Sequence, residues 1–186
     1  MALFIVDVEA DGPAPGLYSM VSFGVVRIQR GPLDCTFHGR VAPISEQWDP
    51  QALAVSGISR DEHLAHPPAA DEMRRFAQWL AENNVGERPV FISDNPAFDW
   101  QFINYYCHAF LGHNPFGHSA RRIGDLFAGL TKDFRATSAW KRLRKTRHTH
   151  HPVDDARGNA EALITMADTY GLKNFVALEQ GRERSA

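Results

Sequence analysis

The sequence predicts an α/β fold in which helices flank a mixed β-sheet. The first observation is an apolar run over residues 3–9, which is typical of a strand buried on both faces. The second is a pair of apolar segments over residues 20–28 and 33–41, joined by turns too short for crossovers, which predicts a three-strand antiparallel meander. The third is the alternation of helix and strand patterns after residue 70, which adds parallel strands and flanking helices.

The remaining elements follow from turn residues and apolar spacing. Residues 43–68 contain four prolines and are expected to be irregular. We expect a helix over 70–83, a short buried strand over 89–93, a helix over 96–110 and a strand end or short helix over 123–130. A last helix over 152–170 begins at Pro152 and ends before Gly171.

Length and composition are those of one globular domain. The 186 residues carry a formal net charge of −2 and 44% are hydrophobic, which excludes a disordered chain and a protein that coats nucleic acid with its whole surface. We expect one domain over residues 1–178 and a polar tail over 179–186. The two cysteines cannot form a four-thiolate zinc site. We find neither a signal peptide nor a membrane-length apolar run, and expect a soluble, cytoplasmic protein.

Two acidic side chains end the first strand. Asp7 and Glu9 are two residues apart, so they share one face of the strand, about 7 Å apart along the chain. Carboxylates at the end of a buried strand are costly unless a cation neutralises them, and a divalent ion would do so. Two solvated surface acids are an equally good interpretation of this pair alone.

Two further groups of polar residues precede or open helices. Asn95 is a natural helix cap, which places Asp99 in the first helical turn, where the helix dipole already favours an acid. Asp154 and Asp155 occupy the first turn of the last helix, and histidines lie just before it. Adjacent helical side chains point about 100° apart, so only one of the two acids can face a shared site.

Together these groups resemble the three motifs of the DEDDh family of 3′→5′ exonucleases, which includes oligoribonuclease, ribonuclease T and proofreading subunits. The first motif is Asp7-Val8-Glu9, the second runs from Asn95 to Asp99, and the third is His150 followed five residues later by Asp155. The resemblance covers about residues 3–170. It implies a ribonuclease-H-like fold, consistent with the mixed sheet expected above.

The resemblance also implies the chemistry. Asp7, Glu9, Asp99 and Asp155 would hold two Mg²⁺ or Mn²⁺ ions, and His150 would be the general base. Two divalent ions can clamp the attacking and leaving oxygens of a phosphodiester, and a neutral histidine can accept a proton near neutral pH. His148 and His151 are the alternative bases, ranked lower.

Candidate substrate contacts lie beside these motifs. Aromatic side chains can stack on a terminal base, and a basic segment can follow a single-stranded backbone. Residues 135–151 contain six basic residues and no acidic one, although a solvated charged face is the usual role of such a run. Phe98 and Trp100 can also be interpreted as core residues of the helix, and for Phe98 the two interpretations are equally good. Met20 and Tyr18 follow the first motif and are expected to line the nucleotide pocket. The candidates are Phe98, Trp100, Met20, Tyr18, Asn95, Lys141, Arg142 and Arg144.

The favoured hypothesis is a metal-dependent 3′→5′ exonuclease that acts on single-stranded nucleic acid and releases nucleoside 5′-monophosphates. RNA is favoured as substrate because the chain resembles stand-alone exoribonucleases. A DNA exonuclease of the proofreading type is one alternative. A catalytically silent nucleic-acid-binding module of the same fold, or a structural carboxylate cluster, is another. The resemblance to small family members also implies a homodimer.

Overall fold

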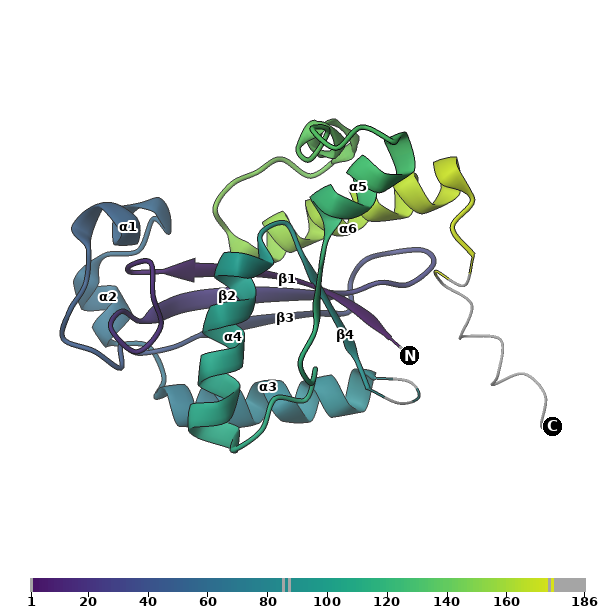
Figure 1. Ribbon diagram of the computed structural model, residues 1–186. Coiled ribbons are helices and arrows are strands. Elements are labelled where there is room, and N and C mark those ends of the chain that lie inside the picture. The colour runs from purple at the N-terminus through teal and green to yellow at the C-terminus, as the bar shows by residue number, and fades with distance from the viewer. Residues whose placement is uncertain (1, 85, 87, 174, 176–186) are drawn as a thin grey trace.

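The computed structural model describes residues 2–175 apart from 85, 87 and 174. Its core is a five-stranded sheet in the order β3-β2-β1-β4-β5 (Figure 1). The central strand β1 pairs antiparallel with β2 and parallel with β4, while β3 and β5 form the two edges. The mixed sheet and its antiparallel meander are therefore confirmed. The strands are β1 (Leu3–Ala10), β2 (Met20–Arg27), β3 (Thr36–Arg40), β4 (Val90–Ser93) and β5 (Ala120–Arg122).

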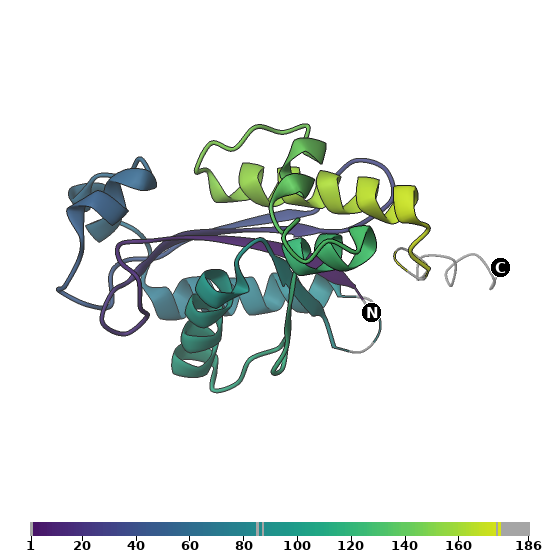
Figure 2. The same ribbon diagram turned by 45° about the horizontal axis from the view of Figure 1, so that its top comes forward.

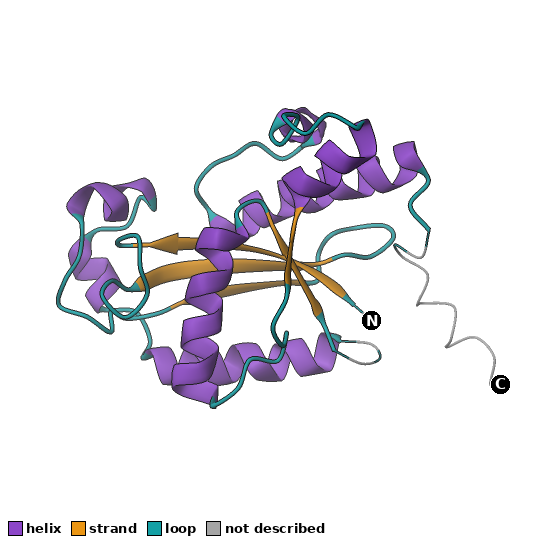
Figure 3. Cartoon of the chain, viewed as in Figure 1, coloured by secondary structure: helices purple, strands orange, loops and turns teal. Residues whose placement is uncertain are grey.

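Helices cover both faces of this sheet (Figures 2 and 3). The pair α3 and α4 packs on one face, and α5 and α6 pack on the other. Two short helices, α1 and α2, form a separate lobe beyond the end of β1 (Figure 1). The helices are α1 (Pro50–Val55), α2 (Arg60–Leu64), α3 (Ala69–Asn83), α4 (Pro96–Leu111), α5 (Ile123–Thr131), α6 (Pro152–Tyr170) and the 3₁₀ helix η1 (Ala139–Leu143).

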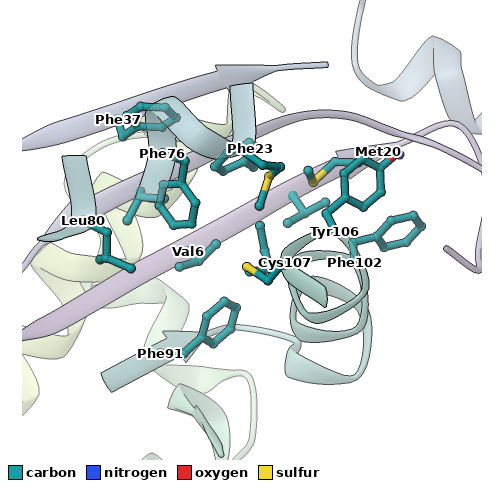
Figure 4. Close-up of a cluster of buried hydrophobic side chains, with 14 of the residues drawn as sticks. Val6, Met20, Phe23, Phe37, Phe76, Leu80, Phe91, Phe102, Tyr106 and Cys107 are labelled. Carbon is teal, nitrogen blue, oxygen red and sulfur yellow. The ribbon is translucent and has the colours of Figure 1, made fainter. Parts of the chain in front are cut away.

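Strand alternation on β1 assigns its residues to two hydrophobic cores. Phe4 and Val6 join the cluster under α3 and α4, which Figure 4 shows with Val6 near its centre. Ile5 joins the cluster under α5 and α6. Asp7 and Glu9 are in phase with Ile5, so the sequence of β1 directs both carboxylates to the α6 side.

Gly24 allows α6 to approach this face of the sheet. It lies directly opposite Asp7 in the antiparallel register of β1 and β2. A Cβ atom at Gly24 would lie 2.2 Å from the Pro152 carbonyl carbon and 2.3 Å from the Val153 nitrogen. A side chain is therefore incompatible with the observed packing, and the first turn of α6 rests on the sheet beside Asp7.

The segment over residues 43–68 differs from the expectation of irregular chain. Asp49 caps α1 by accepting a hydrogen bond from the Gln51 nitrogen, and Ser59 caps α2 through the Glu62 nitrogen. Pro50 occupies the first turn of α1, where a proline starts a helix rather than breaking it. The four prolines therefore do not exclude helix from this segment, because Asp49 and Ser59 cap two short helices within it.

Other boundaries differ by a few residues. The segment over 123–130 is a helix, α5, and the strand β5 ends directly before it. The strand expected over 33–41 is shorter and spans Thr36–Arg40. The 3₁₀ helix η1 was not expected. The expected domain end at residue 178 and the tail over 179–186 lie outside the described residues. None of the described helices has the length and hydropathy required to cross a bilayer.

Candidate active site

The first helical turns of α4 and α6 meet the end of β1 and bring four carboxylates together. Oxygen atoms of Asp7, Glu9 and Asp155 lie within 4.8 Å of one another. Asp99 joins them because its Oδ1 accepts a hydrogen bond at 3.2 Å from the nitrogen of Val8, the residue between Asp7 and Glu9. Its Oδ2 accepts from the Asn95 nitrogen at 3.3 Å. The structure thus unites the four acids that the sequence singled out.

Burial and the charges of neighbouring acids raise the pKa values of Asp7, Glu9 and Asp99. Burial, reinforced by the charges of Asp155 and Asp99, raises the pKa of Glu9 to about 8. Burial is also the main cause that raises the pKa of Asp99 to about 7. The pKa of Asp7 is well above its ordinary value because of burial and the charges of Asp99, Glu9 and Asp155. The site therefore favours a bound cation.

Arg144 is the nearest compensating charge in the described structure. Its Nη2 lies 2.8 Å from Asp155 Oδ1, and the side chain is largely buried. It packs against α6 at Gly158, where a Cβ would lie 2.5 Å from the Arg144 Nε. The charge of Arg144 lowers the pKa of Asp7, but less than burial and the other acids raise it. The predicted phosphate contact of Arg144 thus competes with an ion pair inside the site.

The three histidines before α6 divide between two positions. His150 lies at the site: its backbone nitrogen donates to Asp155 Oδ2 at 2.9 Å, and its Nδ1 lies 3.8 Å from Glu9 Oε1. His148 also reaches the site, with Nδ1 2.8 Å from Asp155 Oδ1. His151 instead lies 3.6 Å from Asp154 Oδ2, outside the cluster. The geometry therefore leaves His148 and His150 as the histidines close enough to act.

His150 is held in an unusual backbone conformation. Its φ is +60°, a left-handed value uncommon for a residue with a side chain. The conformation lets the backbone nitrogens of Thr149 and His150 both donate to the Asp155 carboxylate, at 3.2 and 2.9 Å. Asp155 therefore fixes the loop that carries the candidate base. The His150 side chain remains about half exposed, so it has access to water and substrate.

Three of the predicted substrate contacts are engaged in the hydrophobic core. Met20 has no exposed surface, which corrects its predicted place on the wall of a nucleotide pocket. Trp100 is partly buried and packs edge-on against Phe91 at 5.1 Å. Phe98 is also partly buried, with its ring 5.1 Å from Phe102. The core interpretation therefore describes Met20, whereas Phe98 and Trp100 are both only partly buried and remain candidate contacts.

Tyr18 and Asn95 have accessible side chains. The Tyr18 ring lies against Gly12, and its hydroxyl accepts a hydrogen bond from Gln47 at 3.1 Å. Asn95 occupies the N-cap position of α4, but its side chain makes no capping hydrogen bond. The carboxylate of Asp99 accepts from the Asn95 nitrogen instead. The Asn95 amide is thus available for another partner.

The basic segment before α6 is anchored at several points. Lys141 forms an ion pair with Asp94 at 2.6 Å. Glu161 of α6 accepts hydrogen bonds from the nitrogens of Lys145 and Thr146, at 2.9 and 2.7 Å. Arg142 is exposed. A pocket of about 340 Å³ is lined by this segment and by Asp7.

Sequence reasoning missed Asn159, which lies in the wall of this pocket. Asn159 follows Asp155 by four residues, so it projects from the same side of α6 one turn later. Its Oδ1 is buried and has no hydrogen-bond partner among the described residues. The helical spacing from Asp155 was the available signal.

Sequence reasoning also missed a buried ion pair beside the site. Asp11 is fully buried two residues after Glu9. Its carboxylate accepts a hydrogen bond from the Ser19 nitrogen, lies 3.0 Å from Arg60 Nη1 and 3.7 Å from His63 Nδ1. Burial lowers the pKa of His63 to about 4, so this imidazole is neutral. The pair attaches α2 to the end of β1.

Comparisons with known proteins agree with this geometry. A family model described as an exonuclease, of the ribonuclease T type, matches residues 4–163. A 3′-5′ DNA exonuclease of Escherichia coli, Cap18, is 36% identical over 170 residues, which cover 84% of this chain and 86% of that protein.

Solved structures share the fold at lower identity. The nuclease domain of 3′hExo, a DEDDh family member bound to rAMP, superposes with a TM-score of 0.73 and 18% identity, over 90% of this chain and 92% of that one. Exonuclease I of E. coli in complex with a dA16 oligonucleotide gives a TM-score of 0.63 and 15% identity, over 90% of this chain and 41% of that one.

Proposed function

This chain belongs to the DEDDh family of 3′→5′ exonucleases, and from this premise we propose that it hydrolyses single-stranded DNA stepwise from the 3′ end. The products are nucleoside 5′-monophosphates, and two Mg²⁺ or Mn²⁺ ions are the cofactors. The observation that carries the proposal is the union, beside a partly exposed histidine, of four carboxylates, two of which, Asp7 and Glu9, have no ion pair with any described lysine or arginine.

The choice of DNA rests on the relative that shares 36% of its residues with this chain and is a DNA exonuclease. RNA, which the sequence favoured, is the alternative substrate, and the fold shared with an exonuclease that was solved with rAMP bound supports it. A silent binding module has less support, because the carboxylates and the histidine of the motifs are all present and converge. The homodimer and the cytoplasmic location also stay predictions.

The residues at the site fit divalent ions of the hard, oxygen-preferring class. The donors at Asp7, Glu9 and Asp155 are carboxylate oxygens within 4.8 Å of one another, as Mg²⁺ and Mn²⁺ require. The pKa values of Asp7 and Glu9 are raised, so ionisation of these two acids is costly until a cation is present. We assign Asp7, Glu9, Asp99 and Asp155 as the residues that would hold the ions. When bound, the ions would stabilise the charge that develops on the attacked phosphate.

The remaining steps fall to the side chains of the chain itself. We assign His150 as the general base, which accepts the proton of the attacking water at a ring nitrogen. Asp155 positions it through the hydrogen bond to the His150 nitrogen. Phe98, Tyr18 and Asn95 offer accessible surface to the terminal nucleotide.

The other proposed substrate contacts act mainly through charge. Lys141 and Arg142 are exposed next to the pocket and attract the phosphate backbone. Arg144 reaches a phosphate only by sharing its guanidinium with Asp155. Asn159 adds a buried acceptor for a donor group of the substrate or for a water molecule.

The direct test is degradation of matched single-stranded DNA and RNA labelled at the 5′ end, with Mg²⁺ and with Mn²⁺. We expect a ladder that shortens from the 3′ end, faster on DNA, and no turnover in EDTA. The Asp7→Asn protein controls for contaminating nucleases. Faster digestion of RNA would reverse the substrate assignment, and absence of turnover on both would overturn the proposed activity.

A further inference from the structure

A second group of possible metal ligands shares Asp155 with the carboxylate cluster. The imidazoles of His148 and His150 and the Asp155 carboxylate offer ligand atoms within 4.8 Å of one another. His148 Nδ1 is 2.8 Å from Asp155 Oδ1, and the two imidazole rings lie 4.3 Å apart. This group has two nitrogen donors, whereas the carboxylate cluster has oxygen donors alone.

Donor chemistry separates the ions that the two groups prefer. Imidazole suits Zn²⁺, Co²⁺ and Ni²⁺, while carboxylates suit Mg²⁺ and Mn²⁺. Ligand atoms around a tetrahedral Zn²⁺ are separated by roughly 3.3 Å, given Zn–N distances of about 2.0 Å. The His148 and His150 side chains are about half exposed, so their rings can rotate to bring ligand atoms that lie within 4.8 Å of one another to the spacing that Zn²⁺ requires. Glu9 Oε1, 3.8 Å from His150 Nδ1, can supply a fourth ligand.

Backbone hydrogen bonds to Asp155 set the geometry of the loop that carries the two histidines. The backbone nitrogens of Thr149 and His150 donate to the Asp155 carboxylate, and these bonds keep the two histidines on the same side of α6. Arg144 shares Asp155 Oδ1 with His148, so a cation here meets one positive neighbour. Glu9 and Asp7 place two more carboxylates within 4.8 Å of Asp155 that a bound cation can neutralise.

We propose that His148, His150 and Asp155 form a binding site for a transition-metal ion of the Zn²⁺ class, and that this ion inhibits the enzyme. A ring nitrogen of His150 that is bound to a metal has no lone pair to accept a proton. Asp155 is also drawn from the carboxylate cluster. The inhibitory consequence rests on the proposed function of His150, whereas metal binding itself does not.

The binding test uses Co²⁺ as a spectroscopic probe on the metal-stripped full-length protein. We expect one equivalent of Co²⁺ to give the visible absorption of four-coordinate cobalt, in the presence of excess Mg²⁺, and Zn²⁺ to abolish it. His148→Asn should weaken Co²⁺ affinity at least about 100-fold, because loss even of an outer partner costs 10–100-fold. The exposed neighbour His151 provides the matched control, and His151→Asn should keep the absorption.

The carboxylate cluster is the competing location for the ion. If Asp7→Asn removes the cobalt absorption and His148→Asn leaves it unchanged, the ion binds among the carboxylates and the proposed site is wrong. The same holds if wild-type protein binds Co²⁺ with octahedral, weak absorption only.

Activity then tests the inhibitory role. Each variant is assayed in Mg²⁺ with increasing Zn²⁺ and normalised to its own rate without zinc. His148→Asn should raise the half-inhibitory zinc concentration at least tenfold relative to His151→Asn, and an unchanged value would overturn the inhibition. Cobalt binding in a protein without nuclease activity would refute the proposed function and leave the site standing.

Discussion

Asp7 and Glu9 on β1 and Asp11 directly after it are three carboxylates within five residues, and their negative charges are compensated differently. Asp11 is matched by Arg60 at 3.0 Å and by a hydrogen bond from the Ser19 nitrogen. Asp7 and Glu9 have no ion pair with any described lysine or arginine. Asp11 therefore belongs to the scaffold, and Asp7 and Glu9 belong to the site that we propose binds divalent cations.

Because Asp11 has an ion pair and Asp7 and Glu9 have none with a described lysine or arginine, the end of β1 contributes both to stability and to the proposed active site. Arg60 also stacks over Trp48 at 5.1 Å, so it holds the α1–α2 lobe against the turn after Glu9. Burial raises the pKa of Asp11 as well, but Asp7 and Glu9, which we propose as metal ligands, are also repelled by neighbouring acids, and this repulsion raises their pKa values further. Substitutions at the two places should therefore change different properties. Neutralising one of the proposed metal-binding acids should lower the exonuclease rate, whereas removing the cation beside Asp11 should lower the free energy of unfolding.

Asp7→Asn should have the largest effect on the catalytic side of this comparison. We expect exonuclease activity to fall about 10³-fold, the equivalent of roughly 4 kcal/mol, because a ligand of the ions is lost. The metal-free protein should nevertheless melt at a higher temperature, since a repelling carboxylate is gone. Steady-state kinetics and thermal melting in EDTA measure the two effects. A lower melting temperature would show that Asp7 is structurally compensated after all.

Arg60→Met should have the largest effect on the structural side. The substitution leaves Asp11 buried without its cation, which is expected to cost about 3–5 kcal/mol in the free energy of unfolding. Urea unfolding measures the loss. The double variant Arg60→Met/Asp11→Asn should recover most of it. If the double variant is no more stable than Arg60→Met, the ion pair is not the cause.

Gly24→Ala should separate geometry from charge. The added Cβ displaces the first turn of α6, and with it Asp155 and His150, from Asp7. A misplacement of about 1 Å can cost roughly 10²-fold in rate. The matched control is Gly129→Ala on α5, where the Cβ would meet nothing within 4 Å. Equal rates for the two alanine variants would refute the role of close packing at Gly24.

Stability should depend on pH through the catalytic acids and lose that dependence when metal is bound. The folded-state pKa of Glu9, about 8, exceeds its ordinary 4.5, so its contribution to stability is full below about pH 4.5 and is lost as the pH rises through 8. His63 has a lowered pKa of about 4, and its contribution is complete above about pH 6.5. Between pH 7 and 8, the melting temperature in EDTA should fall by about 2–4 °C. An equal fall in saturating Mg²⁺ would contradict the assignment.

The fold and the four acids could be predicted because their signals are local. Strand alternation places Asp7 and Glu9 on one face, and helix starts place Asp99 and Asp155 in first turns. Parallel pairing of β1 with β4 then joins them. The placement of each acid uses residues at most a few positions apart, whereas the pairing of β1 with β4 is a distant contact, and the resemblance to the three motifs is what indicated that the groups meet.

The remaining features depend on contacts between distant segments. Asp11 and Arg60 are 49 residues apart, and neither carries a local sign of the other. In the sequence, Arg144 is one of six basic residues between 135 and 151. Its ion pair with Asp155 depends on the packing of this segment against α6. Met20 looked suitable for a nucleotide pocket because its strand follows the first motif, yet it is a core residue of that strand.

Calorimetric titration of metal-stripped protein with Mn²⁺ tests the central claim most directly. The account predicts binding to the wild type, binding to Asp11→Asn with similar affinity, and at least a 100-fold loss of affinity in Asp7→Asn. Mn²⁺ binding by Asp7→Asn as tight as that of the wild type would show that the carboxylates at the end of β1 are not the metal site.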